Sequence, residues 1–77
     1  LTRLNKEFSI SKISAPKSFI GKTAQSLNLF ENYNVHCIGI EESIDQITPV
    51  GADHTIQEED RLIVAGKNSD LEKLTKL

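Results

Sequence analysis

Two segments of this chain are apolar on both faces of a β-strand, and they limit the folds that 77 residues can form. Residues 35–40 and 61–66 lack the alternation with polar residues that marks a half-exposed strand. Such strands need cover on both sides, yet only short helices are available to provide it. A domain of this size also buries only about 60% of the surface of its unfolded chain. The sequence therefore predicts that a second copy of the chain supplies part of the cover.

The orientation of side chains in the first of these strands follows from simple alternation. A regular strand places Val35 and Cys37 on one face. Ile38 and Ile40 then belong to the opposite face. Both faces of the strand are thus expected to be covered.

The remaining segments predict the element order β-α-β-β-β-α. Phe8 and Ile10 alternate with serines, which indicates a half-buried strand that ends before Pro16. In order, the expected elements are a strand at 6–13, short helices at 23–27 and 29–33, strands at 35–40 and near 44–50, a turn-like segment at 51–60 anchored by Ile56, a strand at 61–66, and a C-terminal helix marked by Leu71, Leu74 and Leu77.

Capping residues support the helices in this order. Asn28 followed by Glu31 has the form of a capping pair for the second short helix, and Asn34 ends that helix. Ser69 with Glu72 forms a capping box for the last helix. The sequence thus predicts an α+β fold: a small β-α-β-β-β-α domain whose mixed sheet carries helices on one face and which forms a homodimer. We expect residues 1–77 to be one domain, a fragment of a larger protein because the first residue is Leu1.

The composition excludes several classes of function. The net charge is −2, from nine basic and eleven acidic residues, without the basic excess of nucleic-acid binders. No apolar run reaches the roughly 18 residues that a membrane helix needs, so this segment is not expected to insert into a membrane. The single cysteine, Cys37, lies in an apolar run and is expected to be a buried small hydrophobe.

No residue pattern indicates catalysis or a metal site. Gly21-Lys22-Thr23 resembles the end of a phosphate-binding loop, but the loop's first glycine is replaced by Pro16, so a glycine turn with Thr23 as a helix cap is the simpler interpretation. His36 and His54 are too far apart for a zinc motif.

An acidic segment follows the expected strand near 44–50. Asp53, Glu58, Glu59 and Asp60 do not have the spacing of an EF-hand, and a solvated turn explains them more simply than a calcium site. No nucleophile, base and orienting group can be assembled either. We therefore expect no enzyme activity, no catalytic residue, no metal and no cofactor.

Four stretches, taken in order, resemble a known family. They are Gly21-Lys22-Thr23 with Leu27-Asn28-Leu29, then Tyr33-Asn34-Val35 through Ile38-Gly39-Ile40, then Pro49 with Asp53, then Asp60-Arg61-Leu62-Ile63-Val64-Ala65-Gly66. Together they resemble the C-terminal regulatory domain of potassium-transport proteins, called TrkA-C or RCK C-terminal, over roughly residues 7–75.

The resemblance implies a regulatory and dimerisation module on the cytoplasmic face of a membrane transport protein or complex. It implies a homodimer, a membrane-embedded channel or transporter for potassium or another ion as partner, and a small-molecule effector, which in some relatives is cyclic di-AMP. No nucleic-acid polymer is expected as a partner. The expected ligand-binding residues lie on or beside the strand at 35–40: His36, Ile38, Ile40, Glu42, Ile44 and Ile47.

The chain departs from the family pattern at two positions. A basic residue that is frequent in the family after the strand at 35–40 is replaced by Glu41 and Glu42, which argues against strong binding of an anionic dinucleotide. The glycine before Asp60 is replaced by Glu59, so that position is either strained or no longer a left-handed turn. Three alternatives remain open: a purely structural dimerisation domain, an ACT-like domain that binds an amino acid, and a small enzyme.

Overall fold

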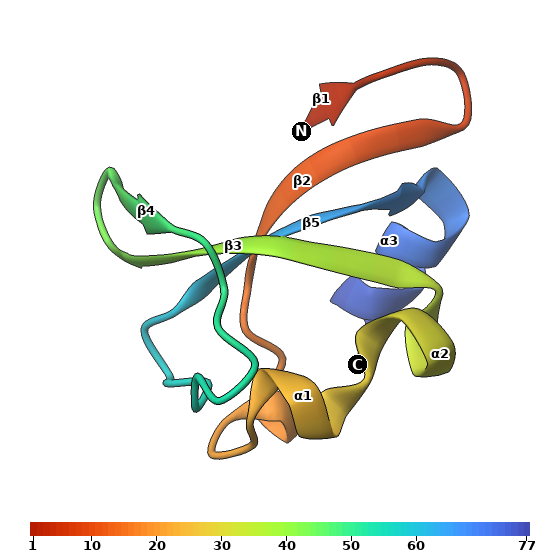
Figure 1. Ribbon diagram of the computed structural model, residues 1–77. Helices are drawn as coiled ribbons and strands as arrows, with labels where there is room; N and C mark the ends of the chain where they lie inside the picture. Colours follow the sequence, from red (N-terminus) through yellow and green to blue (C-terminus); the bar gives the residue numbers. More distant parts are fainter.

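The computed structural model describes all of residues 1–77 as one sheet with helices packed against it (Figure 1). The strands are β1 Thr2–Arg3, β2 Phe8–Ser14, β3 Val35–Ser43, β4 Gln46–Thr48 and β5 Arg61–Lys67. The helices are the 3-10 turn η1 Lys17–Phe19, α1 Ala24–Leu27, α2 Leu29–Tyr33 and α3 Asn68–Thr75. The predicted α+β class is confirmed, while β1 and η1 are elements that the sequence pattern did not indicate.

The strand order is β1-β2-β5-β3-β4, and every neighbouring pair is antiparallel. This corrects the expectation of a mixed sheet. β2 and β3 do run in the same direction, because both are antiparallel to β5. However, β5 lies between them, so no parallel pair forms.

All helices cover one face of the sheet, as predicted. Residues that pair across antiparallel strands share a face, so Leu62 and Val64 of β5 mark the covered side. The core on that side draws on every helix: Phe19, Leu27, Leu29, Val35, Ile40, Ile56, Leu62, Val64, Leu71 and Leu74 are buried together. The opposite side, called the open face below, carries no helix.

A β-bulge in β3 changes which residues face the core. The pairing of β3 with β5 shifts between Cys37 and Gly39, so Ile38 and Gly39 together oppose Ile63. The extra residue brings Ile40 onto the same covered face as Val35 and Cys37. The prediction that Ile40 shares a face with Ile38 is therefore wrong: Ile40 is 1% exposed in the core, whereas Ile38 is 51% exposed on the open face.

The helix ends agree with the sequence in part. Thr23 caps α1 by accepting a hydrogen bond from the Ser26 N–H, as predicted. Asn34 ends α2 in a left-handed conformation, also as predicted. Asn28 adopts a left-handed conformation as well, and its side chain makes no capping hydrogen bond. Because α3 begins at Asn68, Ser69 lies inside the helix and the expected capping box does not form.

Candidate functional site

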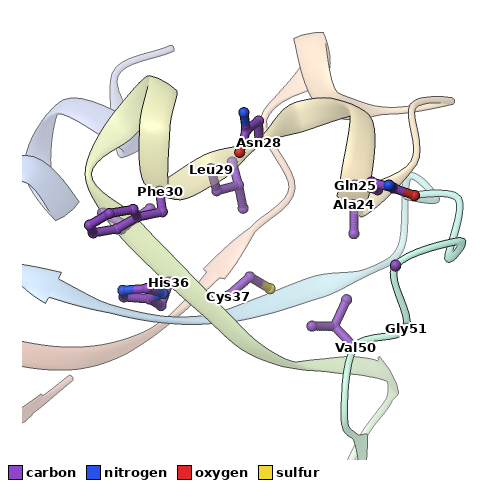
Figure 2. Close-up of a pocket in the computed structure, with 11 residues that line it drawn as sticks. Ala24, Gln25, Asn28, Leu29, Phe30, His36, Cys37, Val50 and Gly51 are labelled. Carbon is purple, nitrogen blue, oxygen red and sulfur yellow. The ribbon is translucent and has the colours of Figure 1, made fainter.

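A groove lies beside the first half of β3. It has a volume of about 410 Å³. Three separate segments line it: Ala24, Gln25, Asn28, Leu29 and Phe30 from α1 and α2, Val35, His36 and Cys37 from β3, and Val50, Gly51 and Ala52 from the chain after β4. Figure 2 shows these side chains around one opening. The sequence pattern indicated only His36 as a candidate here.

The groove exists because β4 is short. β4 pairs with β3 only from Ile40 onward, so Val35–Gly39 has a strand partner on the β5 side alone. After Thr48 the chain leaves β3 and crosses to α1, where the Ala52 carbonyl accepts a hydrogen bond from the Gln25 N–H. The groove is the space between that crossing, the short helices and the unpaired edge of β3.

Phe30 and His36 form an aromatic pair at one end of the groove. Their rings stack with a centroid distance of 4.6 Å and an interplanar angle of 20°. Figure 2 shows the Phe30 ring lying above that of His36. Both residues are exposed, so the pair presents a flat aromatic surface to solvent. Asn28 and Gln25 add amide groups, and no charged side chain lines the groove apart from His36 when it is protonated.

Cys37 lies in the groove but is a poor nucleophile. Its side chain is half-buried, and burial raises the pKa of its thiol, which disfavours the reactive thiolate. The thiol lies 3.5 Å from the Gly39 carbonyl oxygen, to which it donates a weak hydrogen bond. The interpretation of Cys37 as a small apolar residue fits this environment.

The segment between β4 and β5, which forms one wall of the groove, is held by a buried carboxylate. Asp60 is buried, and its Oδ2 accepts the Gln57 N–H at 2.8 Å and lies 2.8 Å from His54 Nε2. The His54 carbonyl in turn accepts the Ala24 N–H. Asp60 is therefore a structural residue and not part of a solvated turn, although Glu58 and Glu59 are exposed.

Glu59 adopts no left-handed conformation. The non-glycine residues with positive φ are Asn28, Asn34 and Asp45. Of the two alternatives for the missing glycine, the structure therefore supports a turn that is no longer left-handed.

The six residues predicted to bind a ligand are distributed over separate surfaces. His36 lies at the groove, while Ile38 and Ile47 lie on the open face. Glu42 and Ile44 lie at the hairpin between β3 and β4. Ile40 is in the core, where its side chain cannot meet a ligand, because the bulge turns it away from Ile38.

The hairpin end of β3 is acidic. Glu41, Glu42 and Glu59 gather there with Arg61 around a depression of about 620 Å³. Glu41 is already paired, since its Oε2 lies 2.8 Å from Lys12 Nζ and its Oε1 lies 3.9 Å from Arg61 Nε. Glu42 and Glu59 are exposed and leave the depression with a surplus of negative charge.

The structure contains neither a cluster of metal-ligating side chains nor a membrane-spanning helix. No group of three or more histidine, cysteine, aspartate or glutamate side chains could hold a metal ion. None of the helices has the length and apolar character needed to span a bilayer.

Comparison with known proteins decides the family. The family model for the TrkA-C domain matches residues 9–77. The chain belongs to the TrkA-C domain family. TrkA-C domains are regulatory domains of potassium-transport systems, so the resemblance noted in the sequence is confirmed. Membership of a family of regulatory domains also fits the expectation that this TrkA-C domain is not an enzyme.

Solved structures share the fold of this TrkA-C domain. One is the regulator of conductance of K⁺ (RCK) C domain of the potassium transport protein KtrA, in complex with cyclic diadenosine monophosphate. The match covers 90% of this chain and 81% of that chain, with a TM-score of 0.80 and 21% sequence identity. Sixteen chains of solved structures match. No curated protein matches.

Proposed function

We propose that this TrkA-C domain is a ligand-responsive regulatory module of a transport system for potassium or another ion. In this proposal it works as a homodimer on the cytoplasmic face of a membrane-embedded channel or transporter. A small-molecule effector acts by changing how two copies pack. Family membership supports the regulatory role, and the groove beside β3 is the observation that carries the ligand-responsive part.

The groove suits an effector because its three walls come from segments that are far apart in the sequence. A ligand there would contact α1 and α2, the unpaired edge of β3 and the chain after β4 at the same time. It would therefore favour one arrangement of these segments over others. A ligand shifts such an equilibrium only by its difference in affinity between two states, typically about 1–3 kcal/mol.

The chemistry of the walls limits the effector. The groove offers an aromatic pair, two side-chain amides and apolar side chains, which suit a mostly uncharged molecule with a flat apolar part. The acidic hairpin beside β4 is unfavourable for an anion. We therefore propose that cyclic di-AMP, the ligand of the KtrA C domain, binds weakly or not at all to this chain.

Two changes in the intact transport protein test the proposal. The first deletes residues 1–77, and we expect ion flux to persist but to lose its response to the effector. If flux and its regulation both stay unchanged, the regulatory proposal fails and a passive structural role is left.

The second change tests the groove itself with a matched pair of variants. Gln25→Trp places an indole in the groove, whereas Gln46→Trp places the same side chain on β4 outside it. We expect only Gln25→Trp to abolish the response. An equal effect of both variants would mean that the groove is not the effector site.

A further inference from the structure

The edge of β3 that borders the groove carries backbone groups without a strand partner. In an antiparallel sheet a residue directs its N–H and C=O to the same side of its strand, and successive residues alternate between the two sides. β5 pairs with one side of residues 35–39, and β4 pairs with the other side only from Ile40 onward. None of the backbone hydrogen bonds outside the helices and strands involves residues 35–39. The N–H and C=O groups of this segment that point away from β5 can therefore bind a ligand.

The accessible part of this edge is short. Val35 and Gly39 are buried, whereas His36 and Ile38 are exposed and Cys37 is half-buried. Three residues of an antiparallel strand span about 10 Å. Strands in sheets are usually about five or six residues long, so this edge is too short to hold a peptide as an added strand. It is long enough for a single amide-sized group, which needs only the N–H and C=O of one strand residue.

The aromatic pair adjoins this edge, because His36 belongs to both. The ring of Phe30 lies against the ring of His36, with their centroids 4.6 Å apart (Figure 2). Each ring uses one face for this contact, and both residues are exposed, so an outer face can take a further flat ring. A ligand with an aromatic ring can therefore stack on the pair while a polar group on that ring reaches the edge of β3.

The surroundings of the edge select an uncharged polar group. No charged side chain lines the groove apart from His36 when it is protonated, so a charged ligand would find no fixed partner there. A carboxylate offers acceptors without a donor, and an ammonium offers donors without an acceptor. A carboxamide or a lactam offers both, which matches the N–H and C=O of the strand. The side chains of Gln25 and Asn28, which also line the groove, can both donate and accept as well.

We propose that the groove binds a flat, uncharged molecule in which an aromatic ring carries a carboxamide or a lactam. The amide of this molecule exchanges hydrogen bonds with the free backbone groups of residues 36–38, and its ring stacks on the pair of Phe30 and His36. This inference rests on the proposed function, because it names the chemical class of the effector that acts at the groove.

Four small probes test the class on the isotope-labelled chain of 77 residues. Benzamide has the ring and the amide, methyl benzoate has the ring and a carbonyl but no N–H, and benzoate carries a negative charge in place of the amide. N-acetylalanine methylamide is a peptide unit without an aromatic ring. The NMR signals of the backbone amides locate each probe on the chain and give its dissociation constant.

A matched pair of variants tests the aromatic contact. Phe30→Ala removes one ring of the pair, whereas Phe8→Ala makes the same change at an exposed phenylalanine of β2 that does not line the groove. Circular dichroism confirms that both variants are folded. We expect Phe30→Ala to weaken the binding of benzamide at least about fivefold and Phe8→Ala to change it less than about twofold.

We expect benzamide to shift the amide signals of residues 36–38 and to bind at least about fivefold more tightly than each of the other three probes. Equal binding of methyl benzoate or of the ringless peptide unit would overturn the assigned class. Shifts confined to another surface, or no shift with any probe, would overturn it as well.

The test of the proposed function in the intact transport protein separates the two conclusions. If Gln25→Trp abolishes the response there and benzamide does not bind to the groove, only the chemical class is wrong. If benzamide binds as expected but Gln25→Trp leaves the response intact, the groove is not the effector site, and both conclusions fail.

Discussion

Lys12 and Glu41 form an ion pair across a strand that separates them. Lys12 lies on β2 and Glu41 on β3, with β5 between, and 2.8 Å separate Lys12 Nζ from Glu41 Oε2. The hydrogen bond from Lys12 holds the pKa of the Glu41 carboxyl below its ordinary value, although burial of the carboxyl opposes this. The pair therefore ties the two outer strands of the three-stranded centre together over β5.

We expect the contribution of this ion pair to the free energy of unfolding to be lost in acid. Because the pKa of Glu41 is lower in the folded chain than in the unfolded chain, its contribution is present above the unfolded pKa, about 4.3. The contribution is lost as the pH falls through the lower pKa of the folded state. We expect Glu41→Gln to be less stable than the unmodified chain at pH 7 and the difference to shrink as the pH falls below about 4. Urea unfolding at a series of pH values measures this, with the exposed Glu42→Gln as control.

The bulge in β3 predicts opposite roles for two nearby isoleucines. Ile40→Ala leaves a cavity in the core and should lower the free energy of unfolding by about 2–5 kcal/mol. The same change at Ile44 on the hairpin tip should alter it by less than about 0.5 kcal/mol. Urea unfolding of the two variants compares them directly. A loss at Ile40 no larger than at Ile44 would contradict the assignment of Ile40 to the core.

The sequence predicted the order of the main elements but not their pairing. Apolar patterns over residues 35–40 and 61–66 identify strands because such runs need burial on both faces. They contain no signal for the insertion of β5 between β2 and β3, which is a long-range contact. The sequence did not indicate the bulge either, because an extra residue in a strand does not change the appearance of an apolar run. The bulge places Ile40 on the face of the sheet opposite to the predicted one.

We expect the buried carboxylate of Asp60 to hold the loop between β4 and β5 in place as a wall of the groove. Asp60→Ala removes the acceptor for the Gln57 N–H and the partner of His54. Leaving these donors without a partner should cost about 1–3 kcal/mol in unfolding free energy. The exposed neighbour provides the control, because Glu59→Ala removes a carboxylate that has no such role. Similar unfolding midpoints for the two variants would show that the buried carboxylate does not hold the loop.

The candidate site was harder to predict than the fold. His36 was expected at a ligand surface because the family resemblance placed the ligand-binding residues on or beside its strand, and it does line the groove. Phe30 and Gln25 were missed, because a groove arises from the way that α1, α2 and the chain after β4 meet, which local patterns do not specify. An aromatic residue in a helix of only five residues was the one signal that could have indicated Phe30.

The acidic hairpin predicts how this chain responds to cyclic di-AMP. Glu42 and Glu59 are both exposed and lie in the same depression. We expect calorimetry to detect weak binding or none in the unmodified chain, because an anionic ligand meets negative charge there. Submicromolar affinity would contradict this expectation.

Reversing one charge tests whether the hairpin is the obstacle. Glu42→Arg replaces a repulsive carboxylate by a donor of charge-assisted hydrogen bonds, each worth about 1.5–3 kcal/mol. We expect this variant to bind cyclic di-AMP about tenfold more tightly or better. Glu58→Arg makes the same change of net charge at an exposed position that does not line the depression, so it corrects for long-range attraction. Equal gains in the two variants would mean that net charge alone is responsible, and no gain in either would mean that the hairpin does not decide whether this nucleotide binds.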